Sequence, residues 1–227
     1  MSRPMEFDRF AGDYENILNQ SVAASGENAG YFAEYKAAYL KRLLPPGFAG
    51  RALDYGCGVG LLSSVLHQQM PGAQIDGFDV SQDSIDRVPA ALNLQGVFTS
   101  DPAALSHAYD LIVIANVLHH IRPDGRQAVF ADLAGRLASG GLLVVFEHNP
   151  ANLVTRWVVA RCPFDHDAVL LPPAETCRYA RAAGLAVARR DYIVFMPRAL
   201  AWLRPLEPWI SWLPAGAQYA MSARKAS

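Results

Sequence analysis

The sequence predicts an α/β fold: a doubly wound, mostly parallel sheet of seven strands with helices on both faces. Short runs that are apolar on both faces alternate with amphipathic segments of helical length over most of the 227 residues. Such strands are covered on both sides, and their alternation with helices indicates a parallel sheet with the helices outside. A ligand binds this kind of sheet in the crevice at the carboxyl ends of the strands.

The first part of the chain, residues 1–44, is predicted to be helical and to cover the crevice as a cap. Aromatic and apolar residues recur at helical spacing from Tyr31 to Leu44, and Pro45 then ends the helix. The alternating pattern occupies residues 50–147. The strands predicted there are 52–55, 74–78, 96–99, 110–115 and 142–146, and the helices are 61–69, 81–88 and 125–137.

The last part of the chain, residues 148–227, is less regular. We expect a helical insertion after the fifth strand, so that residues 149–213 help the amino-terminal helices to cover the crevice. The elements predicted there are helices 149–161, 174–184 and 197–213, a loop 163–173, strand 185–194, and strand 219–223 as an edge strand that closes the sheet. No boundary divides the chain, so we expect one domain over 1–227.

Composition and charge exclude several classes of protein. Twenty basic residues against 21 acidic ones leave a net charge of −1, so the chain lacks the excess of positive charge that is typical of nucleic-acid-binding proteins. Three distant cysteines without a C-x-x-C pair argue against disulfides and structural zinc and suit a cytoplasmic protein. No signal peptide or run of about 20 apolar residues is present, so any membrane contact is expected to be peripheral.

A glycine-rich turn follows the first predicted strand, in the string Leu-Asp-Tyr-Gly-Cys-Gly-Val-Gly that ends at Gly60. Alternate glycines let a ligand lie against the backbone. A dinucleotide fingerprint requires a glycine where Leu61 stands. Asp54, just before the first glycine, disfavours a pyrophosphate and suits a ligand with a cationic amino-acid end. Asp79, at the end of the second strand, suits the ribose hydroxyls of an adenosine.

These motifs resemble those of the class I S-adenosylmethionine-dependent methyltransferases over residues 30–147, and the string Leu-His-His-Ile that ends at Ile121 resembles the branch that acts on small molecules. The resemblance implies their Rossmann-like fold, S-adenosyl-L-methionine as cofactor and S-adenosyl-L-homocysteine as product. Within it, Asp79 matches the ribose acid, Asp101 an acid near the adenine amino group, and Lys36 a cation near the methionine carboxylate. The cofactor-binding residues that it implies are Lys36, Asp54, Gly56, Cys57, Gly58, Gly60, Asp79, Val80, Asp101 and Asn116.

Differences from the motifs of other branches of the family reduce the number of reaction types to consider. Asn116 begins the string Asn-Val-Leu-His rather than the N-P-P-Y of nucleic-acid amino methylases, and no Pro-Cys nucleophile stands there. Metal-dependent catechol-type enzymes have an acid at this place. We therefore expect a metal-free enzyme and a small-molecule acceptor, with no nucleic-acid partner.

Histidines at the ends of the fourth and fifth strands are the candidate catalytic bases. His148 is the first choice and His119 the second, with His120 beside it; a base contributes about 10²–10⁴-fold when a hydroxyl must lose its proton. The alternative for the His119–His120 pair is structural, with one ring capping the strand end and the other exposed. The Asp165-His-Asp string is expected to be a solvated loop or a lid rather than a metal site.

The expected function is transfer of a methyl group to a small-molecule or lipid-linked metabolite, with O-methylation favoured over N-methylation. Two other functions stay open: a non-catalytic module that binds S-adenosylmethionine, and a nicotinamide-dependent oxidoreductase. Trp202, Trp209 and Trp212 are expected to pack against the sheet, the alternatives being an apolar acceptor pocket or a weak peripheral membrane contact. The sequence does not predict the acceptor or the oligomeric state.

Overall fold

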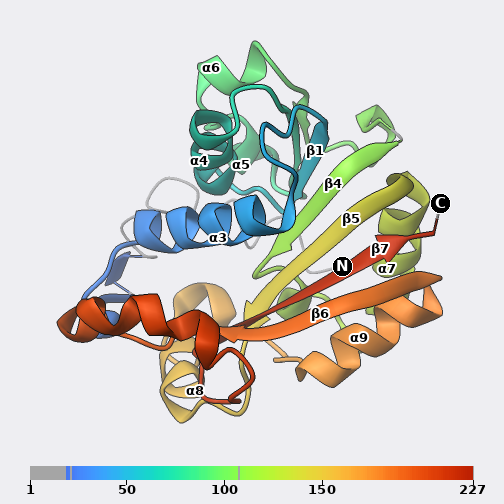
Figure 1. The fold of residues 1–227 in the computed structure, drawn as a ribbon. Coiled ribbons are helices and arrows are strands. Elements are labelled where there is room, and N and C mark those ends of the chain that lie inside the picture. The colour runs from blue at the N-terminus through green and yellow to red at the C-terminus, as the bar shows by residue number, and fades with distance from the viewer. Residues whose placement is uncertain (1–18, 21, 107, 227) are drawn as a thin grey trace.

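The computed structural model describes residues 19, 20, 22–106 and 108–226, and it confirms the predicted fold class. A seven-stranded sheet in the order β3-β2-β1-β4-β5-β7-β6 carries helices on both faces (Figure 1). The strands are β1 (Arg51–Tyr55), β2 (Gln74–Phe78), β3 (Phe98–Thr99), β4 (Tyr109–Ala115), β5 (Leu137–His148), β6 (Leu185–Ile193) and β7 (Gln218–Lys225). The first five strands pair in parallel, and β7 runs antiparallel to both of its neighbours.

The helices of the described residues mostly follow the predicted segments. The α-helices are α3 (Ala29–Leu43), α4 (Leu61–Gln69), α5 (Gln82–Ile85), α6 (Ala90–Asn93), α7 (Pro123–Arg136), α8 (Leu153–Val159) and α9 (Pro173–Ala182). The 3₁₀ segments are η1 (Ala23–Ser25), η2 (Pro102–Ala104), η3 (Leu118–His120), η4 (Pro163–Asp165) and η5 (Arg198–Trp209). The helix predicted over 81–88 is shorter: the Ser81 side chain caps it by accepting from the Ser84 N–H, and it ends at Ile85.

The two faces of the sheet carry separate cores, as alternation along β4 shows. Ile112 and Ile114 pack in the core beneath α7 and α9. Leu111 and Val113 point the other way, into the core beneath α3 and α4. All four side chains are fully buried, which is why this strand is apolar at successive positions rather than alternate ones.

The prediction that residues 219–223 form an edge strand is wrong. β7 lies between β5 and β6, and β6 is the edge. The burial of the two strands explains the order: Tyr219 and Met221 are fully buried, whereas Arg189 and Arg190 in β6 are exposed. Charged side chains on an edge strand also protect it from pairing with other chains.

Polar contacts join α3 to the last third of the chain. The Tyr35 hydroxyl donates to Glu207 Oε2 over 2.8 Å, and Arg204 Nη2 lies 2.6 Å from Glu27 Oε1. These two contacts thus fasten α3 and the residues just before it to η5. Residues 1–18, which belong to the predicted cap, lie outside the described residues.

The expectation that three tryptophans pack against the sheet is also wrong. Trp202 is 75% exposed, Trp209 80% and Trp212 72%. The segment that carries them is a 3₁₀ helix with Pro205 and Pro208 inside it and a kink at its start, so its apolar side chains are not gathered on the face that meets the protein. None of the helices in the described part of the chain combines the length and apolar character needed to cross a membrane.

Candidate active site

A cavity of about 700 Å³ opens at the carboxyl ends of the parallel strands. Its walls come mainly from α3, the turn after β1, the ends of β2, β4 and β5, η3, one face of α7, and the segment from α8 to η4. Cavities of this size hold small organic ligands. Its place in the sheet is the crevice that the sequence predicts.

The turn after β1 forms a cradle of backbone along this cavity. Gly56 and Gly58 have φ values of +82° and +52°, and Gly60 begins α4 with a φ of +82°. A Cβ atom on Gly56 would lie 2.2 Å from Cγ2 of Val117, so no larger residue fits there. Glycine is required both for these dihedral angles and for the close approach to the loop after β4.

Asp79 fixes this cradle from the end of β2. Its Oδ2 accepts from the Gly58 N–H over 2.8 Å, and its Oδ1 accepts from the Ser81 N–H over 2.9 Å. The carboxylate lines the cavity. Asp79 is therefore placed to hold the loop and to meet a ligand at once.

Two buried groups of opposite charge, Asp54 and Lys36, lie at the α3 side of the cavity. Asp54 is 2% exposed and accepts a hydrogen bond from the Ser63 hydroxyl over 2.7 Å. Burial raises the pKa of Asp54 to about 6, although the Ser63 hydrogen bond opposes the shift. Burial lowers the pKa of Lys36 to about 8, although Glu147 and Asp54 oppose it. Such a pair suits a zwitterionic amino-acid end.

Two buried polar atoms that line this cavity lack partners. Asn116 Oδ1 and Gln218 Oε1 have no hydrogen-bond partner among the described residues. Leaving such an atom unpaired costs about 1–3 kcal/mol, which a donor on a bound molecule would recover. Asn116 also has a φ of +57°, a strained conformation of the kind found at binding sites. Gln218 was not predicted; its signal was a polar side chain at the start of a buried strand.

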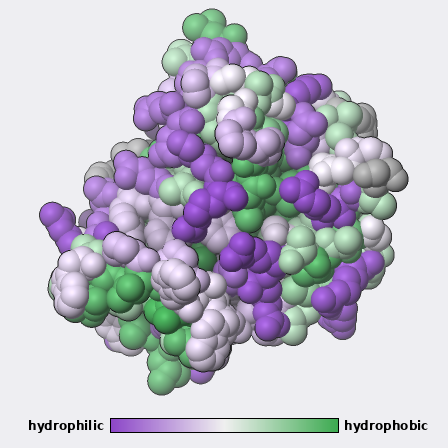
Figure 2. Space-filling model, viewed as in Figure 1, coloured by the Kyte–Doolittle hydropathy of each residue, from purple (hydrophilic) through white to green (hydrophobic). Residues whose placement is uncertain are grey.

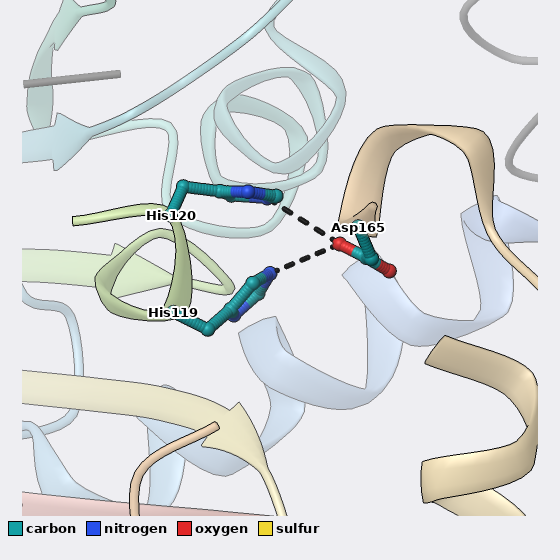
Figure 3. Close-up of side chains that lie close together, drawn as sticks. All are labelled: His119, His120 and Asp165. Atoms are coloured by element: carbon teal, nitrogen blue, oxygen red, sulfur yellow. Dashed lines mark hydrogen bonds and ion pairs between the residues drawn. The ribbon is translucent and has the colours of Figure 1, made fainter. Parts of the chain in front are cut away.

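A cluster of histidines and carboxylates lies at the same cavity, and Figure 3 shows three of its side chains. His119 is almost fully buried, with Nδ1 2.6 Å from Glu147 Oε2 and Nε2 3.2 Å from Asp165 Oδ1. His120 Nε2 lies 3.4 Å from the same Asp165 oxygen. The His148 ring is centred 5.0 Å from the His119 ring. The three imidazoles and the Asp165 carboxylate thus come together on the cavity wall, with Glu147 behind His119.

The three imidazoles differ in their pKa values because their electrostatic surroundings differ. Burial alone would lower the pKa of His119, but the carboxylates of Glu147 and Asp165 outweigh it and raise this pKa to about 9. Burial, and next the charge of His119, lower the pKa of His120 and of His148 to about 4. Around neutral pH His119 is therefore cationic, while His120 and His148 are neutral.

The structure corrects one expectation about this cluster. Neither ring of the His119–His120 pair is exposed, because the side chains are 1% and 16% accessible. In the loop that follows α8, Asp165 lines the cavity and faces the histidines, while the next two residues, His166 and Asp167, are exposed. A local string could not show which of its two aspartates turns inward.

Arg126, which sequence reasoning missed, holds the loops that carry this cluster. It is 1% exposed, and its Nε donates to the carbonyl oxygens of Leu118 and Ile121. Its Nη2 donates to the Val169 carbonyl over 2.6 Å. A single buried guanidinium thus ties η3 to the segment after η4, and an arginine on an amphipathic helix gives no local signal of that role.

The remaining predicted residues divide between those that line the cavity and those that do not. Cys57 and Val80 line it. Gly60 and Asp101 are not among the lining residues, although Pro102 is. Asp101 is exposed and caps η2, with its Oδ1 accepting from the Ala103 N–H over 2.9 Å. Contact between Asp101 and an adenine therefore stays a prediction.

Comparison with known proteins decides what kind of site this is. The model of a family described as a methyltransferase domain matches residues 29–191. The chain belongs to this methyltransferase family. It is an S-adenosylmethionine-dependent methyltransferase, which removes the nicotinamide-dependent oxidoreductase from consideration.

The chain is also similar to individual proteins, in sequence or in fold. The chain is 28% identical over 191 residues to the ubiquinone biosynthesis O-methyltransferase of Cereibacter sphaeroides, covering 76% of each protein. It is 34% identical over 105 residues to a protein of Synechococcus, covering 42% of this chain and only 25% of that protein. Magnesium protoporphyrin IX methyltransferase of Synechocystis, solved with bound S-adenosylhomocysteine, has a TM-score of 0.62 at 18% identity, covering 91% of this chain and 86% of that one.

The cavity of this methyltransferase fits its cofactor. The glycine cradle leaves room for a ligand against the backbone, and Asn116 Oδ1 and Gln218 Oε1 can accept hydrogen bonds from a bound molecule. Lys36 and Asp54 would hold the amino-acid end, and Asp79 the ribose. When bound, S-adenosylmethionine supplies a methyl group that its sulfonium centre has already activated.

We expect the affinity for S-adenosylmethionine to fall below about pH 6, by about tenfold per pH unit. The free protein protonates Asp54 with a pKa of about 6, so at lower pH the ligand's ammonium group must displace a proton before it meets a carboxylate. Titration calorimetry across this pH range measures the slope. Asp54→Asn should bind more weakly at neutral pH and lose the slope; a wild-type affinity that stays flat down to about pH 5 would contradict the assignment.

Proposed function

We propose that this enzyme methylates a hydroxyl group of a small or lipid-linked metabolite. The observation that carries the proposal is the meeting of His148 with His119 and His120 on the wall of the cofactor cavity. A neutral imidazole accepts a proton from a hydroxyl, as O-methylation of an unionised acceptor requires. The Cereibacter relative, an O-methyltransferase by name, supports the same class of acceptor.

His148 is the proposed base, and the charge of His119 sets the electrostatic environment around it. The His148 ring lies at the carboxyl end of β5, and the low pKa of His148 leaves it neutral at physiological pH. His119 is held between two carboxylates and is not free to take a proton. We therefore assign proton transfer to His148 and acceptor positioning to His119.

A lipid-linked acceptor is favoured by an apolar surface beside the cavity. Val158 of α8 lines the cavity, while Leu153, Val154 and Trp157 of the same helix are at least half exposed. The loop after η5 is tied to the start of α8, since Asn152 Nδ2 donates to the Ala215 carbonyl. Apolar atoms accordingly gather over η5 and α8, at the lower left of Figure 2.

We propose that this surface, formed by the exposed residues of α8 and by Trp202, Trp209 and Trp212, rests on a lipid bilayer. Tryptophan prefers the membrane interface, where its ring is buried and its N–H stays hydrated. Arg161, whose guanidinium lies 4.1 Å from the Trp157 ring centre, adds a positive charge at the same place. A lipid-linked acceptor would then reach the cavity from the membrane beside α8.

Four matched acceptors test this proposal. They carry either a hydroxyl or an amine, each with or without a lipid tail, and the tailed pair is presented in phosphatidylcholine–phosphatidylglycerol vesicles. We expect methylation of the hydroxyl pair. The variant with Trp202, Trp209 and Trp212 all changed to Ser should lose about tenfold activity on the tailed hydroxyl and none on the soluble one, because burying one tryptophan is already worth more than that factor.

Leu94→Ser is the matched control, because Leu94 is 86% exposed but lies after α6, outside this surface. It should change neither activity. Methylation of the amines alone would overturn O-methylation. Equal activity of the triple variant on both hydroxyl acceptors would overturn the membrane contact.

A further inference from the structure

We infer that His119, His120 and Asp165 form a binding site for one divalent transition-metal ion, with Zn²⁺ as the best fit. The three ligand atoms, two imidazole nitrogens and one carboxylate oxygen, all lie within 4.8 Å of one another. They come from two separate segments, η3 and η4, that meet at the cavity (Figure 3). Imidazole and carboxylate together suit zinc and its neighbours in the first transition row.

Two distances within this cluster also suit ligands that share one ion. A charge-assisted N–H···O bond is about 2.7–2.9 Å long, and the His119–Glu147 contact, at 2.6 Å, is of that kind. The distances from Asp165 Oδ1 to His119 Nε2 and to His120 Nε2 are 3.2 and 3.4 Å. Two ligands at about 2.0–2.1 Å from a tetrahedral zinc ion lie about 3.3 Å apart.

Glu147 supplies the outer partner that such a site needs. Metal-binding histidines usually donate their other ring N–H to a carboxylate, which fixes the tautomer and the ring orientation. Glu147 Oε2 meets His119 Nδ1, while its Oε1 accepts from the backbone N–H groups of Val117 and Leu118. Glu147 is therefore held by three hydrogen bonds, and it orients the His119 ring so that Nε2 faces Asp165; a metal ion bound there would replace the Nε2 proton of the cationic ring.

The site is also accessible and incomplete, as a reactive metal site must be. All three ligands line the cavity, and three protein ligands leave at least one position for an oxygen of another molecule. A metal at that place would acidify a hydroxyl bound to it, so that a weak base such as His148 would suffice. The expectation of a metal-free enzyme is based on Asn116 and on the three adjacent residues of the Asp165-His-Asp string, whereas this cluster takes only Asp165 from that string and both histidines from η3.

The test is metal binding by the full chain after removal of metal with a chelator. Zn²⁺ is titrated by calorimetry, and Co²⁺ by its visible absorption, which reports the coordination geometry. We expect one ion per chain with four- or five-coordinate cobalt bands. His120→Gln and Asp165→Asn should each weaken binding by at least about 100-fold, and Glu147→Gln by about 10–100-fold, as for outer partners elsewhere.

The matched control is the double variant His166→Gln, Asp167→Asn, which changes the same residue types in the exposed part of the same loop. It should bind as the wild type does. Absence of stoichiometric binding, or equal binding by Asp165→Asn and the control, would overturn the inference. Circular dichroism identifies a variant that does not fold. In that case the cobalt spectrum of the wild type tests the inference, and octahedral bands would overturn it. Methyl transfer is assayed separately, so failure of metal binding leaves the proposed function standing.

Discussion

Replacing Asp79 with alanine is expected to weaken the binding of S-adenosylmethionine and S-adenosylhomocysteine by at least about 100-fold. The carboxylate holds the glycine cradle through Gly58 and turns the chain through Ser81. As the proposed ribose acid it also accepts two hydrogen bonds from the cofactor. Hydrogen bonds to a charged group contribute about 1.5–3 kcal/mol each, so losing two of them accounts for a factor of this size. Titration calorimetry with both ligands measures it.

Asp83→Ala provides the comparison for this variant, because Asp83 is an exposed acid on the neighbouring helix α5. It should bind both ligands as the wild type does. Unchanged binding by Asp79→Ala would show that its carboxylate does not contact the cofactor. The ribose assignment would then be wrong.

Replacing His148 with glutamine should lower kcat by about 10²–10⁴-fold on a hydroxyl acceptor and leave cofactor affinity unchanged. Glutamine keeps much of the size and the hydrogen-bonding capacity of histidine but has no basic nitrogen. The binding groups for the cofactor, Lys36, Asp54 and Asp79, come from other elements, so they should not be disturbed. Steady-state kinetics and calorimetry together separate the two effects.

His67→Gln is the matched control, since His67 lies on α4 and is not among the residues that line the cavity. Its kcat should equal that of the wild type. If His148→Gln also kept its kcat, His148 would serve only to position the acceptor. The acceptor would in that case arrive already ionised, as a carboxylic acid or an acidic phenol does.

The cofactor side of this site could be predicted from the sequence because its information is local. The glycines after β1 must adopt positive φ, and Asp79 must follow a strand at a set distance from them. Each requirement concerns a short stretch of sequence, one just after β1 and the other just after β2. Secondary structure was predictable for the same reason, since strands buried on both faces are apolar throughout.

The acceptor side could not be predicted because its contacts join distant segments. Asp165 meets His119 only when the loop after α8 folds over η3, and Arg126 is what ties these loops together. The order of the last strands depends on pairing in the same way. A run such as 219–223 shows that it is buried, but it does not show which strands lie on either side.

The place of β7 in the sheet has a consequence for synthesis of the protein on the ribosome. β6 leaves the ribosome before β7, yet β6 pairs in the sheet through β7 alone. The nascent chain can therefore assemble the sheet from β3 to β5, while β6 and the preceding α9 must wait for a later segment. Gln218, the first residue of β7, completes the cavity wall at that last step. The emerging enzyme thus has its glycine cradle early but acquires a finished cavity only when the sheet closes.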